Sequence, residues 1–209
     1  MVPSPLASEI EAALGHGEIW EAYPRSGVMS VKTRATIEDL YKVEGKAELV
    51  NGEIVLMSPT GGIPGRAGGV IYASLLQHER LQGHGYAFPD NGGFIVNLPH
   101  RESFSPDAAW YIGALRGGDF LDGAPIFAVE VRSKNDYGPA AEAALKEKRA
   151  DYFTCGTLVV WDVDVLREPV IRVYRAGDPE NPTIYRRGDI AEAEPAVLGW
   201  RMAVNELLT

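Results

Sequence analysis

The sequence predicts an α/β fold in which helices flank a central mixed β-sheet and a β-hairpin lies near the N-terminal side of the domain. Three observations predict it: an Asn-Gly pair between two apolar runs, two segments with helical periodicity, and several separate runs with strand character. Their order along the chain is helix, hairpin, helix, several strands, helix and strands. This order is typical of a mixed sheet with helices on its faces.

The start of the chain divides into an N-terminal extension, residues 1–35, and one domain, residues 36–209. Within the extension, residues 8–15 begin with the spacing of a capping box and are expected to form a short helix. A second short helix is expected from Thr36. It leads into two apolar runs around Asn51-Gly52, which is the strongest local pattern for a two-residue hairpin turn.

The next part of the chain is predicted as a loop, a helix and two strands. Residues 58–69, SPTGGIPGRAGG, lack the Gly-Lys-Ser/Thr ending of a phosphate-binding loop and are expected to form a flexible loop over a cleft. Residues 70–82 have apolar side chains at helical spacing and should cover one face of the sheet. Residues 86–98 and 105–112 are predicted as strands, joined by a turn at 99–102.

The last third of the chain alternates between strand and helix. A strand is expected at 126–132, followed by a helix at 140–153 that Gly156 ends. Strands are then expected at 157–164 and 170–175, with a shorter one near 183–185.

Composition restricts the class of protein. With 45% hydrophobic and 23% charged residues, the chain is typical of one globular domain. It has neither an apolar run of the roughly 20 residues needed to span a bilayer nor a basic leader, so we expect a cytoplasmic protein without membrane contact. Its single cysteine, Cys155, excludes an internal disulfide and a cysteine-based zinc cluster.

The net charge of −9 argues against a broad basic surface that grips nucleic acid through its phosphates. An active site that holds a divalent metal through carboxylates is still compatible with this charge, because the metal supplies the positive charge at the scissile phosphate.

Two carboxylates occur in predicted strands. In IFAVEVRS, alternation places Glu130 and Arg132 on the same face of a strand that otherwise looks buried. Asp107 follows Pro106 at the start of an apolar strand. In the helix after Glu130, Lys148 lies on the apolar stripe with Tyr152, while Lys146, Glu147 and Arg149 should face outward. A lysine on that stripe needs a carboxylate or a phosphate, and Glu130 is its expected neighbour.

This set matches the needs of phosphodiester hydrolysis. Asp107 and Glu130, helped by a backbone carbonyl near Val131, could hold Mg²⁺, which polarises a phosphoryl oxygen and acidifies a bound water. Lys148 or Arg132 would neutralise the charge that develops on the phosphate or orient the water.

Several segments together resemble a known family: AELVNGEIVLMSP, GGFIVNLPHRESFSPDAAW, FAVEVRSKND, the spacing of Lys148, Tyr152 and Gly156 before LVVWDVD, and IRVYR. Over residues 36–207 the chain resembles the bacterial Uma family of restriction-type endonucleases, a branch of the PD-(D/E)XK nuclease superfamily. The resemblance implies a restriction-endonuclease-like fold, Mg²⁺ as cofactor with Mn²⁺ as a substitute, DNA as substrate, and a homodimer.

The resemblance also implies roles for single residues. Asp107 corresponds to the aspartate of the PD element, and Glu130 to the acidic residue of the (D/E)XK element. Arg132 stands where the pattern has lysine, and an arginine stays protonated and cannot accept a proton from water. Lys148 would supply the missing amine. Glu48 matches the glutamate that precedes the Asn-Gly turn in the family and would complete the metal site.

Each residue also has a purely structural interpretation. Asp107 could cap a turn, and Glu130 could form an ion pair with Arg132 or Lys148. The Lys148 side chain could extend to solvent. Glu48 could be a solvated residue opposite Val55 in the hairpin.

The leading hypothesis is therefore an Mg²⁺-dependent endonuclease that cleaves DNA. The second is a catalytically degenerate relative that serves as a nucleic-acid-binding or assembly module, which Arg132 and the acidic composition favour. A third is a hydrolase of nucleotides or other small phosphorylated molecules, which would require a closed, narrow pocket.

Overall fold

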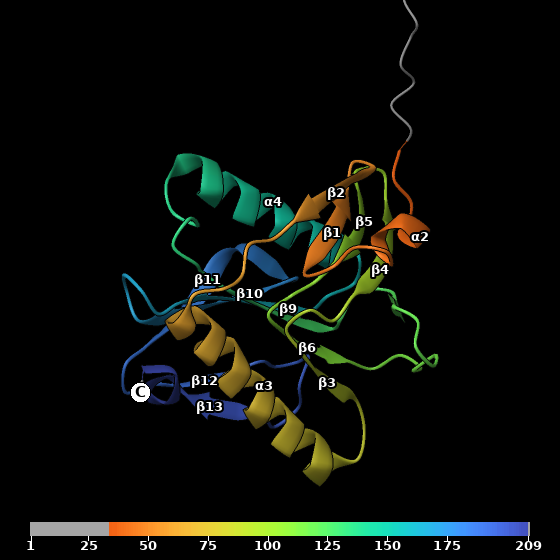
Figure 1. The fold of residues 1–209 in the computed structure, drawn as a ribbon. Coiled ribbons are helices and arrows are strands. Elements are labelled where there is room, and N and C mark those ends of the chain that lie inside the picture. The colour runs from red at the N-terminus through yellow and green to blue at the C-terminus, as the bar shows by residue number, and fades with distance from the viewer. Residues whose placement is uncertain (1–33, 209) are drawn as a thin grey trace, which may run out of the picture. The chain divides into compact units, whose positions relative to one another are not determined.

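The computed structural model describes residues 34–208, which belong to the compact unit Arg34–Thr209 (Figure 1). The helix expected at residues 8–15 lies outside the described residues. In chain order the elements are α2 Ile37–Leu40, β1 Ala47–Val50, β2 Glu53–Leu56, α3 Gly62–Gln82, β3 Tyr86–Pro89, β4 Phe94–Leu98, β5 Arg101–Phe104, β6 Ala108–Tyr111, β7 Leu121–Asp122, β8 Phe127–Val131, α4 Pro139–Thr154, β9 Val159–Asp164, β10 Val170–Arg175, β11 Asp178–Arg186, β12 Ile190–Glu192, β13 Arg201–Ala203 and the 3₁₀ helix η1 Val204–Leu208.

The mixed α/β architecture is confirmed. A six-stranded sheet has the order β11-β10-β9-β8-β6-β3, in which β8 and β9 are parallel and the other pairs antiparallel. A five-stranded sheet has the order β2-β1-β5-β4-β7, and β12 and β13 form a separate pair. Helix α3 packs on one side of the six-stranded sheet, and α4 crosses near the β1–β2 hairpin (Figure 1).

Both local predictions near the start of the domain are confirmed. Thr36 caps α2, and Asp39 completes a capping box by accepting a hydrogen bond from the Thr36 backbone. Strands β1 and β2 pair around Asn51 and Gly52, whose φ angles of 55° and 69° are those of a type I′ turn.

The prediction of a glycine-rich loop at residues 58–69 is wrong for most of this segment, because α3 already begins at Gly62. Pro64, Ala67 and Ile71 bury their side chains against the sheet, and this packing outweighs the low helical propensity of the glycines. Gly68 lies closest to the strands: a Cβ at this position would be 3.5 Å from the carbonyl oxygen of Asp107. The glycine therefore lets α3 approach the end of β6.

Between residues 86 and 112 two strands were predicted, and the structure has four: β3, β4, β5 and β6. The turn predicted at residues 99–102 ends at His100, because Arg101 already begins β5. Residues 86–98, expected as one strand, form β3 and β4, which belong to different sheets. Arg101 is buried and bonded to carboxylates from other elements, so its strand depends on contacts that are distant in sequence.

Two apolar clusters hold the domain together. One joins α3 to the sheet and the C-terminal elements and includes Trp110, Trp161 and Trp200. The other lies on the opposite side and includes Phe104, Tyr152 and Val160. The C-terminal strands and η1, which contribute to the first cluster, were not anticipated. No helix among residues 34–208 has the length and apolar character required to span a membrane.

Candidate active site

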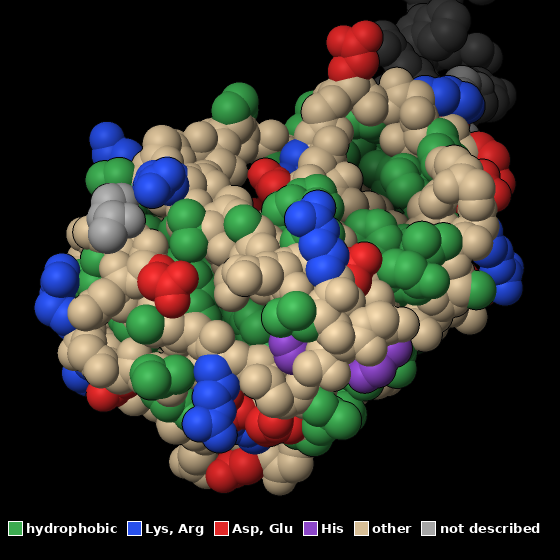
Figure 2. Space-filling view, turned by 90° about the horizontal axis from the view of Figure 1, so that it is seen from below, with side chains coloured by type: hydrophobic (Ala, Val, Ile, Leu, Met, Phe, Trp, Pro, Cys, Tyr) green, Lys and Arg blue, Asp and Glu red, His purple; other side chains and the backbone are tan. Residues whose placement is uncertain are grey.

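An open cleft of about 1010 Å³ lies between the β1–β2 hairpin, the start of α3, the ends of β6 and β8, and α4. Figure 2 shows one hollowed face of the molecule, on which acidic and basic side chains are interspersed and no continuous basic patch forms. The cleft itself contains every predicted site residue: Glu48, Asp107, Glu130, Val131, Arg132 and Lys148.

Asp107 is fixed at the edge of the cleft by the neighbouring strand. Its Oδ2 accepts a hydrogen bond of 2.7 Å from the backbone N–H of Val131, so the carboxylate bridges two strands and does not cap its own turn. Its Oδ1 lies 2.6 Å from the Lys46 ammonium, which also lies 2.6 Å from Asp90. The charged form of Asp107 is thus well supplied with donors.

Glu130 lies one strand away, on β8, and its side chain is 16% exposed. Its Oε1 accepts hydrogen bonds from Lys148 at 2.9 Å and from the Tyr152 hydroxyl at 2.8 Å. Its Oε2 has no partner among residues 34–208. Burial, and then the charges of Asp107 and Glu48, raise the pKa of Glu130 above its ordinary value despite the attraction of Lys148. One oxygen of this carboxylate is therefore available to a ligand.

Lys148 lies where the helical stripe predicts it, and it does not extend to solvent. Its ammonium lies 2.8 Å from Glu48 and 2.9 Å from Glu130, and the side chain is only 14% exposed. Burial alone would lower its pKa, but the two carboxylates outweigh burial and raise it. Lys148 therefore stays protonated and supplies charge; it does not accept protons.

Glu48 is buried, so its interpretation as a solvated residue is wrong, although its pairing with Val55 is confirmed. Its Oε1 accepts from Lys148 and from the Ser105 backbone at 2.9 Å, and its Oε2 accepts from Arg101 at 2.7 Å. Burial would raise the pKa of Glu48, but the charges of Lys148 and Arg101 hold it below its ordinary value. Both of its oxygens are occupied by donors.

Arg132 is likewise held by carboxylates. Its guanidinium makes two hydrogen bonds of 2.6 Å to Asp162 and also binds Glu142, with one contact of 3.0 Å and a second to Oε1. Arg149, expected to face outward, instead packs over the ring of Tyr174 at 4.0 Å. That part of the helix prediction is wrong, because Tyr174 of β10 packs against the Arg149 guanidinium.

Comparison with known proteins identifies the family. The family model described as Uma2, "Putative restriction endonuclease", matches residues 35–205. The chain belongs to the Uma2 family. Its fold is similar to the crystal structure of "a putative nuclease belonging to DUF820" from Anabaena variabilis ATCC 29413, with a TM-score of 0.64, 16% identity, and coverage of 82% of this chain and 96% of that one. No match was found among curated proteins.

Membership in Uma2 supports nuclease function in general. The family resemblance predicted from the sequence, over residues 36–207, is confirmed, since the family model matches nearly the same residues. The fold prediction is confirmed by the similar structure.

Sequence reasoning missed Lys46 as a site residue of this Uma2 protein. Lys46 and Glu48 are two positions apart in the β1 segment, so strand alternation places them on the same side. The same alternation identified Glu130 and Arg132 and could have identified Lys46. Arg101 and the hydroxyl of Tyr152 were also missed as partners of the buried carboxylates, because both contacts join residues far apart in sequence.

The oxygen donors of the cleft suit a hard divalent cation. Within the part of the chain that the structure describes, no group of three or more His, Cys, Asp or Glu side chains is arranged to hold a metal ion. Mg²⁺ does not require one, since it is commonly bound by one or two carboxylates together with water. The unpartnered Oε2 of Glu130 meets that requirement. Asp107 accepts two donors, one at each oxygen, and its side chain is 14% exposed. Glu48 accepts three donors and its side chain is only 4% exposed, so it is the least suited of the three to bind a cation.

Proposed function

We propose that this Uma2 protein is a metal-dependent endonuclease of the PD-(D/E)XK type that hydrolyses phosphodiester bonds in DNA. One observation carries the proposal: carboxylates from two neighbouring strands, Asp107 and Glu130, open onto one cleft beside two lysine ammonium groups. Their oxygens are held in place by the strand backbone, by Tyr152 and by the lysines themselves. The preorganised charges would therefore act on a phosphate without a large rearrangement.

Asp107, Glu130 and the backbone carbonyl of Val131 would hold Mg²⁺, or Mn²⁺ in its place. When bound, the ion would polarise a phosphoryl oxygen and lower the pKa of a coordinated water. Lys46 already contacts Asp107, and burial is outweighed by the charges of Asp107 and Glu130, which raise the pKa of Lys46. Lys46 would orient Asp107.

Lys148 would stabilise the negative charge that develops on the phosphate. Its ammonium is buried, protonated and directed at Glu130, so it lies beside the group that would contact the ligand. Glu48 holds Lys148 from the other side, and we assign it this positioning role in place of metal ligation. Arg132 anchors the end of β8 to β9 and α4 through Asp162 and Glu142 and would also be a positioning residue.

The decisive experiment is cleavage of supercoiled plasmid DNA with Mg²⁺ or Mn²⁺, with EDTA as the metal-free control. Asp107→Asn and Glu130→Gln should abolish nicking while thermal unfolding stays cooperative. Asp119→Asn, which changes an exposed carboxylate outside the cleft, should cleave like the wild type. Cleavage that persists in EDTA, or in both site variants, would refute the assignment.

Duplex cleavage on both strands favours paired sites, so we further propose a homodimer. Light scattering after size-exclusion chromatography would test it: a mass near twice 22.7 kDa supports the dimer, and a mass of one chain contradicts it. The cytoplasmic location remains a prediction.

A second candidate function is a nucleic-acid-binding or assembly module without catalysis. The observation that favours it is Arg132, which stands at the usual lysine position and has its donors occupied by two carboxylates. This candidate predicts binding of nucleic acid but no cleavage of duplex DNA, single-stranded DNA or RNA with either metal.

A further inference from the structure

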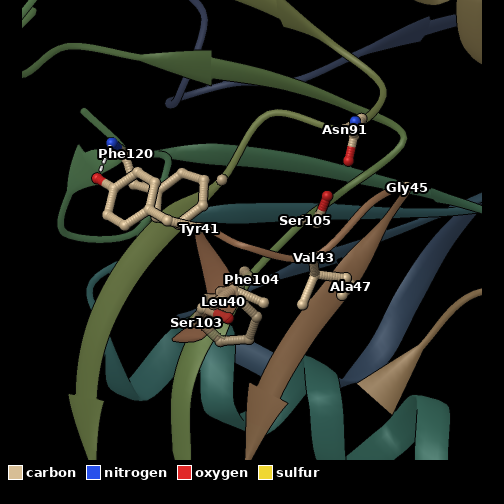
Figure 3. Close-up of a pocket in the computed structure, with 11 residues that line it drawn as sticks. Leu40, Tyr41, Val43, Gly45, Ala47, Asn91, Ser103, Phe104, Ser105 and Phe120 are labelled. Carbon is tan, nitrogen blue, oxygen red and sulfur yellow. Dashed lines mark hydrogen bonds between the residues drawn. The ribbon is translucent and has the colours of Figure 1, made fainter. Parts of the chain in front are cut away.

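A second pocket, of about 170 Å³, lies beside the cleft. The two share a wall, because Ala47 lines this pocket while its chain neighbours Lys46 and Glu48 line the cleft. Figure 3 shows the pocket between the segment that follows α2, the turn at Asn91 and the end of β5. None of the residues assigned to the metal site lines this pocket.

Three aromatic side chains, Tyr41, Phe104 and Phe120, line part of the pocket. Tyr41 stacks on Phe120 with ring centroids 4.0 Å apart and nearly parallel planes, at 7°. Phe104 is fully buried and stacks in turn on Tyr152, also at 4.0 Å. Tyr152 is the residue whose hydroxyl holds Glu130. A flat apolar ring in the pocket would therefore lie close to a side chain that supports the active site.

Two polar groups of the pocket have no partner within residues 34–208. The Ser105 hydroxyl is buried and makes no hydrogen bond, although the Ser105 backbone N–H binds Glu48. The side-chain amide of Asn91 is exposed at the rim and makes none either. Figure 3 shows these two groups pointing toward one another. A buried hydroxyl without a partner costs free energy in the folded protein, so a ligand that bonds to it recovers that cost.

The size of the pocket restricts its occupant. An engineered cavity of about 150 Å³ in another protein holds one benzene ring. A pocket of about 170 Å³ therefore has room for one six-membered ring. Ser105 and Asn91 both offer donors and acceptors, which suits a ring that carries both kinds of group on its edge. A pyrimidine base has this size and chemistry.

We propose that this pocket binds one pyrimidine ring, supplied by a nucleotide of the nucleic acid strand that lies in the cleft. The proposal rests on the nuclease function above. Ser105 is two residues from Asp107, a separation on the order of 7 Å along an extended chain, so the base would belong to a nucleotide near the scissile phosphate. Enzymes that take a base out of its stack hold it in this way, between aromatic side chains and polar groups that read its edge.

The first test uses free thymine and adenine as probes, with saturation-transfer NMR to measure binding. Thymine should bind more tightly than adenine, whose ring system is larger. Ser105→Ala should weaken thymine binding by roughly tenfold, the value of about one hydrogen bond, and should raise the melting temperature slightly, because it removes a buried hydroxyl that has no partner. Asn91→Gly, which suits the positive φ of 67°, should have a similar effect.

Filling the pocket gives a second variant. Ala47→Leu should abolish thymine binding, while Ala150→Leu, a matched change at an exposed position of α4, should not affect it. Equal binding of adenine and thymine, thymine binding that none of these variants changes, or a large loss of stability in Ser105→Ala would overturn the proposal.

The source of the ring is tested with short single-stranded oligothymidylates in which one nucleotide at a time is abasic. Removing the base at one position should weaken binding by roughly 5- to 100-fold, the range for one stacked base, and Ala47→Leu should abolish this dependence. If thymine binds but no oligonucleotide position matters, the ring does not come from the substrate, and that part of the proposal fails. If plasmid cleavage is also absent, the nuclease function fails separately.

Discussion

Two clusters of charge lie on the same strand, two residues apart, and they differ in how completely their groups are satisfied. Around Arg132, donors and acceptors match: Asp162 and Glu142 occupy the guanidinium, and the Asp162 side chain is only 2% exposed. Around Glu130, whose side chain is 16% exposed, one carboxylate oxygen is open to the cleft and the pKa is raised. The first cluster is built to hold the chain together, whereas the second retains capacity to bind a ligand.

After the two carboxylate variants, which should abolish cleavage, the largest effect is expected from Lys148→Met. This change removes the protonated amine beside Glu130 and should reduce plasmid cleavage by roughly 100-fold or more, the scale of losing one preorganised electrostatic group. Lys148→Arg should recover part of the rate, because it restores the positive charge with a different geometry. Initial nicking rates at saturating Mg²⁺ would measure both variants, and a Lys148→Met protein with wild-type rates would place catalysis elsewhere.

Arg132→Met should act mainly on stability. Asp162 would remain buried without its partner, and breaking such a pair costs about 3–5 kcal/mol. For a chain of this size the melting temperature should fall by roughly 6–20 °C. Calorimetry checks the value. If Arg132→Met instead melts like the wild type but fails to cleave, Arg132 acts on the substrate and the contrast between the two clusters is wrong.

The raised pKa of Glu130 gives a pH-dependent prediction for the metal-free protein. Native Glu130 keeps its proton to higher pH than the unfolded chain does, so its contribution to stability is present at low pH and is lost as pH rises through the native pKa. Relative to the wild type, Glu130→Gln should therefore become more stable as pH increases from about 4 to 8, by a few degrees in melting temperature. Parallel melting curves in EDTA over this range test the sign. If the melting temperature of Glu130→Gln instead fell relative to that of the wild type as pH rises, the raised pKa would be contradicted.

The smallest effect is expected at an exposed ion pair. Lys146 and Glu180 lie 2.7 Å apart, but both side chains are more than half exposed. Lys146→Ala should change the free energy of unfolding by about 1 kcal/mol at most and leave cleavage unchanged. The same melting and nicking assays serve as its measurement. If the free energy of unfolding fell by more than this, an exposed ion pair would contribute as much to stability as a buried one, and exposure would not distinguish the two kinds of ion pair in this protein.

Features that depend only on residues close together in the chain could be predicted from the sequence. Asn51-Gly52 determines its own turn, and Lys148 lies on the stripe that 3.6 residues per turn requires. The start of α3 was not predictable, because the glycines of 62–69 become helical only when Ala67 and Ile71 pack on the sheet. Strand β5 was missed for a similar reason, since Arg101 reads as a turn residue until Glu48 and Asp151 surround it.

The candidate site follows the same division. Asp107, Glu130 and Lys148 could be named from strand and helix periodicity together with the family resemblance. The engagement of Glu48 by Arg101 and of Arg132 by Asp162 depends on pairings between distant strands. These pairings separate the residues that are free to bind a ligand from those that are already satisfied.

The most direct test of the central claim is a crystal structure of the protein soaked in Mn²⁺, with anomalous scattering to locate the ion. We expect one Mn²⁺ peak within coordination distance of both Asp107 and Glu130. No peak in the cleft, or a peak that contacts neither carboxylate, would contradict the account.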